Sequence, residues 1–337
     1  MKEGKRVAFL VIIALVVTSL QVESLTVGET EALNDMKKEW GQVLGWSGAP
    51  SCQWSYVYCD TADHVVELSV PTNRPGRYPL QGTIPNSIWK LFAVQTIGLA
   101  VNNLTGTVPA SIWNLTQLTS LTLVANQLSG TIPDGNWSSS GLQSIDFGRN
   151  LLSGTIPPSL LCSAQGLQLV DLSQNRLSGD LPDCLSDMVD LTSFDVNTNF
   201  LSGTVPSLKR LALLEQFIVS SNSFSGDFSS FWPAPSPLLE NFFASDNAFH
   251  GSLPSNLAQY TGLSMLYVDR NRLSGTIPAL PFTDLYLNLS RNQFSGTIPP
   301  IPSFSSTKFN SCQLDFSNNL LSGTIPSSFC PSRYAPP

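Results

Sequence analysis

Apolar side chains recur along most of this chain in a fixed order, and each group of them ends at an asparagine. The full pattern reads L-x-x-L-x-L-x-x-N-x-L-S-G-x-I-P. Its alternating L-x-L core predicts a short strand with one buried face. The glycine suits a tight bend, and the Ile-Pro step favours an extended, non-helical return. Each copy therefore predicts one strand, a turn and a return segment.

Eleven copies follow one another, which indicates a repeat solenoid. Most are 23 to 25 residues apart, the first spacing is 29, and the last two are 21 and 27. We expect the asparagines to be buried and to bond backbone groups of neighbouring coils, because buried amides need such partners. The copy after Asn222 lacks the Ile-Pro step, so we expect an irregular bulge on the convex side there. The asparagines are Asn73, Asn102, Asn126, Asn150, Asn175, Asn199, Asn222, Asn247, Asn271, Asn292 and Asn319.

The amino-terminal segment 1–24 predicts export. The segment begins with the basic residues Lys2, Lys5 and Arg6, and an apolar run follows over 7–20. Small residues then fit a signal-peptide cleavage site after Ser24. The alternative is an uncleaved anchor, but the run is short for a hydrocarbon core about 30 Å thick. We therefore expect a secreted or cell-surface protein (cell wall or apoplast included). Attachment to a membrane would need a partner or a missing carboxy-terminal segment.

Composition and charge exclude several classes of function. Apolar residues make up 42% of the chain and charged residues 12%, which is not the composition of a disordered protein. The net charge is −7, without a basic patch, so nucleic acid is a poor partner. The two histidines, His64 and His250, lie in different coils, and no catalytic or phosphate-binding motif accompanies them. We expect no enzyme activity, no cofactor and no metal.

The repeated L-S-G-T-I-P motif resembles the plant-type extracellular leucine-rich repeat, and the resemblance covers about residues 29–330. That family includes ectodomains of receptor-like kinases and receptor-like proteins, and polygalacturonase-inhibiting proteins; similar repeats occur in surface antigens of kinetoplastid protists. The resemblance implies an α/β repeat solenoid, a right-handed curved superhelix of about 11 repeats with a concave parallel β-sheet and caps at both ends. It divides the chain into a signal peptide (1–24), a cap (25–64), the solenoid (65–330) and a short tail (331–337).

The amino-terminal cap carries part of this resemblance. Residues 29–40 predict a short amphipathic helix, and the Cys52-x-Trp54 and Cys59 spacing that follows resembles the family's cap. Tyr56 stands where the plant form usually has glycine. The resemblance implies structural cysteines in an exported chain, with the pairs Cys52–Cys59, Cys162–Cys184 and Cys312–Cys330.

Ligand recognition is expected on the concave face, where the outward strand positions vary freely. At the central outward position, six successive coils carry three aspartates and then three apolar residues. An acidic row is often only solvated, whereas a row of exposed apolar groups usually marks a contact surface. The predicted ligand-binding residues are Asp146, Asp171, Asp195, Ile218, Phe243 and Tyr267.

Four N-x-S/T sequons predict glycans in an exported chain: Asn103, Asn114, Asn136 and Asn288. Taken together, the sequence predicts a recognition protein whose partner is an extracellular protein, peptide or glycan. Two alternatives remain open: an inhibitor of a secreted cell-wall-degrading hydrolase, and a structural surface-coat antigen of a protist.

Overall fold

A computed structural model describes residues 25–71, 78–137, 141–164, 166–280, 286–300 and 313–326. The asparagines that end the repeats are called the ladder asparagines below. Several sequence predictions lie outside the described residues: the leader 1–24, the first ladder asparagine Asn73, the Cys312–Cys330 pair and the tail 331–337.

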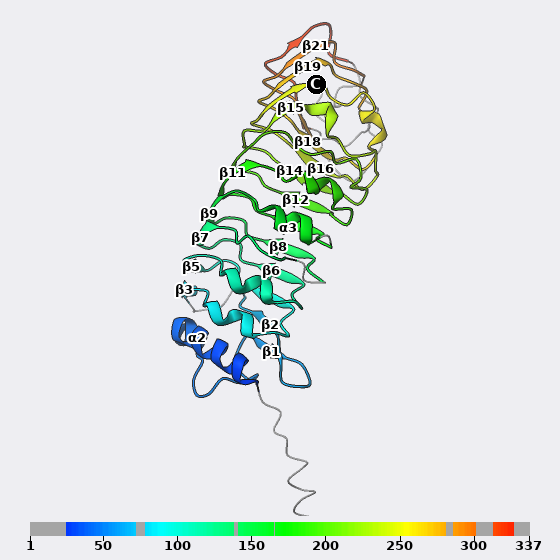
Figure 1. Ribbon diagram of the computed structural model, residues 1–337. Coiled ribbons are helices and arrows are strands. Elements are labelled where there is room, and N and C mark those ends of the chain that lie inside the picture. The colour runs from blue at the N-terminus through cyan, green and yellow to red at the C-terminus, as the bar shows by residue number, and fades with distance from the viewer. Residues whose placement is uncertain are drawn as a thin grey trace, which may run out of the picture.

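The strands of the repeats stack in chain order into one long sheet (Figure 1). Within the described residues this sheet has 12 strands, and every neighbouring pair after the first is parallel. From β4 to β20 the central residue of each strand is buried, as the apolar alternation predicts. The solenoid expected from the sequence is therefore confirmed. In order, the strands are β1 (Val57–Cys59), β2 (Val65–Ser69), β4 (Thr96–Gly98), β6 (Ser120–Thr122), β8 (Ser144–Asp146), β10 (Leu169–Asp171), β12 (Ser193–Asp195), β14 (Gln216–Ile218), β16 (Asn241–Phe243), β18 (Met265–Tyr267), β20 (Tyr286–Asn288) and β22 (Gln313–Asp315).

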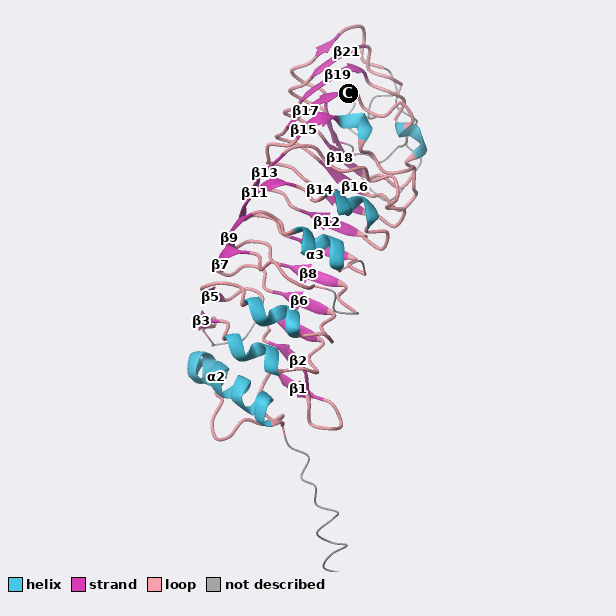
Figure 2. Ribbon diagram, viewed as in Figure 1, coloured by secondary structure: helices cyan, strands magenta, loops and turns pink. Residues whose placement is uncertain are grey.

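A second set of short strands, which the sequence pattern did not predict, lies along another edge of the solenoid (Figure 2). These strands follow the ladder asparagines and pair in parallel in three groups. Between the second and third groups only an isolated bridge joins Thr204 and Ser225. The groups are β3 (Gln81–Thr83) with β5 (Asn103–Thr105); β7 (Ser129–Thr131), β9 (Leu151–Gly154), β11 (Arg176–Asp180) and β13 (Phe200–Ser202); and β15 (Ser225–Asp227), β17 (Ala248–Gly251), β19 (Arg272–Thr276), β21 (Gln293–Gly296) and β23 (Leu320–Leu321).

The ladder asparagines join each coil to the one before it, as expected. Six of the ten described ones are buried, whereas Asn222, Asn247, Asn271 and Asn319 are partly exposed. Asn126 is typical: its Oδ1 accepts a hydrogen bond from the backbone N–H of Leu104 at 3.0 Å. Its Nδ2 donates to the Leu99 carbonyl at 2.9 Å, also in the preceding coil, and to the carbonyl of Leu123 in its own coil at 3.0 Å. One side chain thus satisfies three buried backbone groups that the turn leaves without strand partners.

The residue before each described ladder asparagine adopts a left-handed backbone conformation. Its φ lies between 52° and 56° in all ten coils, although none of these residues is glycine. In the coil of Ala125 this turn lets the backbone N–H donate to the Gly148 carbonyl of the next coil at 2.9 Å. Hydrogen bonding between coils therefore offsets a conformation that normally costs a side chain about 1–2 kcal/mol. The ten residues are Val101, Ala125, Arg149, Gln174, Thr198, Ser221, Asp246, Arg270, Arg291 and Asn318.

The template glycine is needed both for its conformation and for its missing side chain. Gly154 has a φ of 79°, and a Cβ there would lie 2.9 Å from Cγ2 of Thr131 in the preceding coil. The threonine methyl group therefore packs directly onto the glycine, which couples neighbouring coils along the second set of strands.

The return segments carry short helices: η1 (Asn86–Lys90), η2 (Ala110–Asn114), α3 (Pro158–Ser163), η3 (Asp183–Asp187), η4 (Phe228–Ser230) and η5 (Leu257–Gln259). The coil after Asn222 is irregular beyond η4, as expected, but its aromatic side chains point into the core. Phe228, Phe231 and Trp232 are buried, and Trp232 stacks on Phe242 with ring centroids 4.2 Å apart. The rings of this segment fill the core, so they offer no exposed binding surface.

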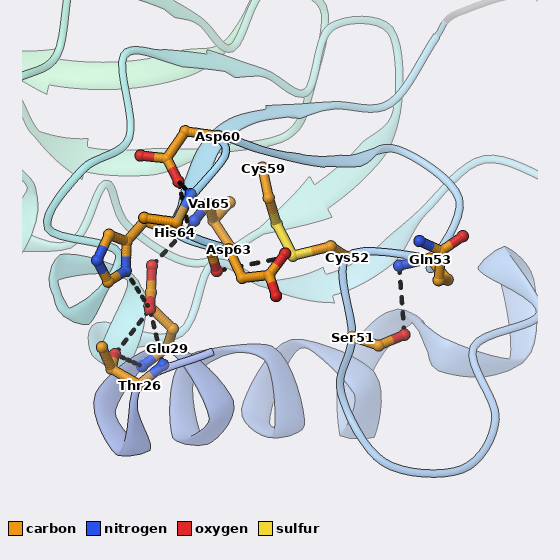
Figure 3. Close-up of a disulfide and its surroundings, with 11 residues drawn as sticks. Thr26, Glu29, Ser51, Cys52, Gln53, Cys59, Asp60, Asp63, His64 and Val65 are labelled. Carbon is orange, nitrogen blue, oxygen red and sulfur yellow. Dashed lines mark hydrogen bonds and ion pairs between the residues drawn. A yellow bond between two sulfur atoms is a disulfide. The ribbon is translucent and has the colours of Figure 1, made fainter. Parts of the chain in front are cut away.

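The amino-terminal cap includes the helix α2 (Val27–Leu44), which lies at one end of the stacked coils (Figure 1). Figure 3 shows Glu29 at the start of this helix beside Val65 of β2. A capping box joins Thr26 and Glu29 at its start. Glu29 is fully buried, and its Oε1 accepts a hydrogen bond from the backbone N–H of Val65 at 2.9 Å. The carboxylate that begins the helix therefore also anchors it to the first parallel strand. The predicted helix is confirmed, and it extends beyond residues 29–40 at both ends.

Two of the three predicted disulfides lie in the described residues, and both are present. Cys52–Cys59 closes the cap loop, and Cys162–Cys184 joins α3 to η3 in the next coil. Tyr56, inside the first loop, has a φ of 73°. The position where related caps usually have glycine is thus one that requires a left-handed backbone.

Candidate functional site

The six predicted binding residues lie in one row across six neighbouring strands of the long sheet. Pairing is in register throughout, so Asp146 faces Asp171, which faces Asp195, and the row continues through Ile218, Phe243 and Tyr267. Each is the last residue of its strand and is partly exposed, because it follows a buried central residue. We call these six residues the sheet row. The structure brings them together as the sequence predicted, whereas their role in binding stays a prediction.

The three aspartates of the sheet row also shape the backbone. The Oδ1 atom of each accepts a hydrogen bond from a backbone N–H two residues further on: 3.1 Å for Asp146, 2.8 Å for Asp171 and 2.8 Å for Asp195. Such local bonds favour a turn at the end of a strand. Part of the reason for aspartate at this position is therefore structural.

Burial raises the pKa of two of these carboxyl groups. The pKa of Asp146 and that of Asp195 are each raised to about 6, mainly because the side chains are partly removed from water. The charge of Asp171, which lies between them in the row, raises both values further. The negative charge of the row therefore decreases when the pH falls through about 6.

Gly148 leaves room for the side chains of Asp171 and Ser173 to pack against the backbone. A Cβ at this position would lie 2.9 Å from Oδ1 of Asp171 and 3.1 Å from Oγ of Ser173. The equivalent positions of the next two coils carry Ser173 and Asn197, so the glycine departs from its neighbours. Gly148 is not among the predicted binding residues, although its departure from Ser173 and Asn197 is visible in the sequence.

The apolar half of the sheet row contains a pair of stacked rings. Phe243 and Tyr267 lie with ring centroids 4.9 Å apart and an angle of 14° between their planes. Burial, followed by the neighbours Tyr286 and Asp269, raises the pKa of Tyr267, so its phenol is neutral at physiological pH. Met265 and Tyr286 pair in register at the start of their strands and border the stacked rings.

Asn288 continues the row next to Tyr267. Its Oδ1 accepts hydrogen bonds from Ser290, from the backbone N–H at 3.1 Å and from Oγ at 2.8 Å. The side chain is partly buried, whereas the other sequon residues Asn103, Asn114 and Asn136 are exposed. Glycan attachment at all four stays a prediction.

The described residues contain no group of three or more His, Cys, Asp or Glu side chains placed to hold a metal ion. His64 contacts Glu29 in the cap at 3.3 Å, and His250 is exposed on β17. None of the helices in the described ranges has the length and hydropathy that a membrane span requires.

Comparison with known proteins identifies the repeat. The profile of the Leucine Rich Repeat family matches residues 166–188, 285–304 and 312–332. The crystal structure of a TDR receptor is similar at 28% identity, with a TM-score of 0.63 over 74% of this chain and 47% of the receptor chain. The leucine-rich-repeat ectodomain of the membrane receptor kinase GASSHO1/SCHENGEN3 from Arabidopsis thaliana, in complex with Casparian strip integrity factor 2, is similar at 26% identity, with a TM-score of 0.65 over 90% of this chain and 42% of that one.

This chain thus spans less than half the length of those two receptor chains. A plant ice-binding protein shares the fold over its whole length and 92% of this chain, with a TM-score of 0.71 and 24% identity. Among curated proteins no sequence match is found. The resemblance to plant-type extracellular leucine-rich-repeat proteins is confirmed by these similarities.

Proposed function

We infer that this leucine-rich-repeat solenoid, whose repeats are of the plant extracellular type, is a recognition protein that binds an extended peptide or protein segment along its sheet row. The observation that carries this proposal is the unbroken register from Asp146 to Tyr267, which ends in the stacked rings of Phe243 and Tyr267. Stacked, partly exposed aromatic side chains are typical of contact surfaces.

The dimensions of the row suit an extended chain. Six strands about 4.8 Å apart span roughly 24 Å, which equals about seven residues of extended polypeptide. The ligand would cross the strands and present alternate side chains to the sheet. The ligand backbone does not need to form strand hydrogen bonds, because each strand of the sheet row already pairs with a neighbouring strand on either side.

The chemistry of the row defines the two ends of the ligand. Asp146, Asp171 and Asp195 favour a basic end, and their charges mainly increase the association rate. Phe243 and Tyr267 favour an aromatic or aliphatic end, which supplies most of the affinity by burying apolar area. A ligand with both features would bind in one direction only.

Two further observations support an extracellular role. The disulfides Cys52–Cys59 and Cys162–Cys184 are typical of oxidising compartments. The similar GASSHO1/SCHENGEN3 ectodomain was solved with a bound factor. We therefore propose that this protein acts after export, as a receptor-like binding module.

A peptide-selection experiment tests the proposal. The secreted protein would be used to select from a random dodecapeptide library, and bound peptides should combine basic with aromatic or aliphatic residues. The Phe243→Ala/Tyr267→Ala double variant should bind them at least about 30-fold more weakly, since loss of a central anchor costs about 2 kcal/mol or more.

The matched control is Phe200→Ala, which removes an exposed ring from β13, outside the sheet row. It should bind the selected peptides like the parent protein. Equal binding by the double variant would rule out the aromatic half of the row as the site, and failure to select any peptide would contradict the proposal as a whole.

A further inference from the structure

A hollow of about 720 Å³ lies where the cap meets the first return helices, away from the sheet row. It is lined by the start of the cap helix α2, by η1 with the residues that follow it, and by the last residue of η2. The lining residues are Thr26, Gly28, Trp89, Lys90, Phe92 and Asn114.

Two aromatic walls of this hollow face solvent. Trp89 is 44% exposed and Phe92 is 48% exposed, and Val27 at the adjoining start of α2 is exposed as well. Large apolar groups gathered in one exposed depression usually have a partner that covers them.

Contacts with the cap hold both rings in place. The Lys90 ammonium group lies 5.8 Å from the centroid of Trp89 and also forms an ion pair with Glu31 of α2. Phe92 contacts the His64 ring edge-on, with centroids 4.8 Å apart. The hollow is therefore a preformed surface, and covering it would require little rearrangement of the protein.

One lining residue can itself carry the covering group. Asn114 begins the sequon Asn114-Leu115-Thr116, and both Asn114 and Thr116 are exposed. Asn114 is the last residue of η2 and one of the residues that line the hollow. The other sequon residues, Asn103, Asn136 and Asn288, are not among the residues that line it.

We propose that Asn114 carries an N-linked oligosaccharide whose core sugars fill this hollow and lie against Trp89 and Phe92. In the modification, Nδ2 of Asn114 forms a bond to C1 of the reducing-end sugar of a lipid-diphosphate-linked oligosaccharide. The bond from C1 to the lipid diphosphate breaks, the diphosphate leaves, and the amide loses one proton. The proposal depends on export of the chain, and it is independent of ligand binding at the sheet row.

The chemistry of the hollow suits a sugar. The apolar C–H faces of a pyranose ring can pack on the negatively polarised faces of aromatic rings. Lys90 lines the hollow, and its ammonium group has three donors, so it can donate to a sugar hydroxyl group beside its ion pair with Glu31. The glycan would thereby shield apolar surface at the junction between the cap and the first coils.

Hydroxyl-radical footprinting tests the proposal without altering either ring. The full chain would be secreted from eukaryotic cells as the parent, Asn114→Gln and Asn136→Gln proteins, and glycopeptide mass spectrometry would first give the occupancy of Asn114. Trp89 and Phe92 should be oxidised several-fold more slowly in the parent than in Asn114→Gln. The Asn136→Gln protein, which lacks a different predicted glycan, should match the parent.

A second measurement follows the sugar itself. In the folded parent protein, an amidase should release the Asn114 glycan more slowly than the Asn136 glycan, and this difference should vanish after denaturation. The Phe92→Ser variant should lose the protection, whereas Phe200→Ala should keep it. An unmodified Asn114 in the secreted parent, or equal oxidation of Trp89 with and without the Asn114 glycan, would overturn the proposal.

Discussion

The side chain of Asn175 accepts a hydrogen bond from the backbone N–H of Leu152, 23 residues earlier, at 3.0 Å. Its Nδ2 donates to the carbonyl of Phe147 at 3.0 Å, also in the preceding coil. A single buried amide thus adds side-chain hydrogen bonds to the strand pairing that joins these two coils. The stability of this solenoid therefore depends on side chains that act between neighbours.

Replacing Asn175 with leucine should destabilise the protein. The backbone N–H of Leu152 would lose its partner, and an unsatisfied buried group costs about 1–3 kcal/mol. The carbonyl of Phe147 would keep the hydrogen bond from Nδ2 of Asn150. Urea unfolding measures the loss. Because coils contact only their neighbours, hydrogen exchange should increase mainly in the coils around residue 175.

The control is Gln127→Leu, which makes a similar amide-to-leucine change at an exposed position. It should alter stability by no more than about 0.5 kcal/mol. Equal unfolding midpoints for the Asn175→Leu and Gln127→Leu proteins would contradict a stabilising role of the ladder.

At Tyr56, substitution by glycine should give a more stable protein than substitution by alanine, which is the reverse of the usual order. Its φ of 73° is unfavourable for any residue with a Cβ, so Tyr56→Gly should be more stable than Tyr56→Ala by about 1 kcal/mol. Both variants lose the ring, which isolates the backbone effect. At Lys38, an exposed position of α2, alanine should be the more stable of the two by about 0.5–1 kcal/mol. The same order at both positions would refute backbone strain at Tyr56.

Disulfide mapping under non-reducing conditions should recover three local pairs. Cys52–Cys59 and Cys162–Cys184 are present in the structure, and the predicted pair Cys312–Cys330 would be tested directly. A Cys162→Ser/Cys184→Ser variant should lose up to about 3 kcal/mol, since the bond closes a loop of 22 residues. A peptide linking Cys330 to a cysteine of the cap would contradict the open solenoid.

The contribution of Asp146 and Asp195 to the free energy of unfolding should become more favourable as the pH falls. The folded-state pKa values of Asp146 and Asp195, about 6, lie above the ordinary value of 3.8. Between pH 4 and 6 the folded protein therefore binds more protons than the unfolded chain, and stability decreases as the pH rises through this interval. Relative to an Asp146→Asn/Asp195→Asn variant, the parent should gain stability between pH 7 and pH 4.5 in urea unfolding.

Asp315 provides the matched control, because hydrogen bonds from Ser317 lower the pKa of its carboxyl group. Relative to Asp315→Asn, the parent should gain nothing between pH 7 and pH 4.5 and should lose stability at lower pH. If the free energies of unfolding of the parent and of the Asp146→Asn/Asp195→Asn variant change equally with pH, these two carboxyl groups have ordinary pKa values in the folded protein.

The sequence alone determined the solenoid, the ladder and the alignment of the sheet row. These follow from the repeat itself, because a fixed spacing of leucines and one asparagine places equivalent residues of successive coils side by side. Asp146, Asp171 and Asp195 could be aligned by counting, and so could Phe243 and Tyr267. The two local disulfides of the described residues followed in the same way, through the resemblance that the repeats revealed.

Tertiary structure decided the features that depend on contacts between coils. The left-handed residues before the asparagines, such as Val101 and Ala125, have no common side chain, because their conformation is imposed by hydrogen bonds to the next coil. The second set of strands depends on the same pairing. Phe231 and Trp232 turn inward against Phe228, and no local pattern specifies this arrangement. The hollow between Trp89 and Asn114 arises only where the cap helix meets the first coils, since its walls come from segments that local propensity does not bring together.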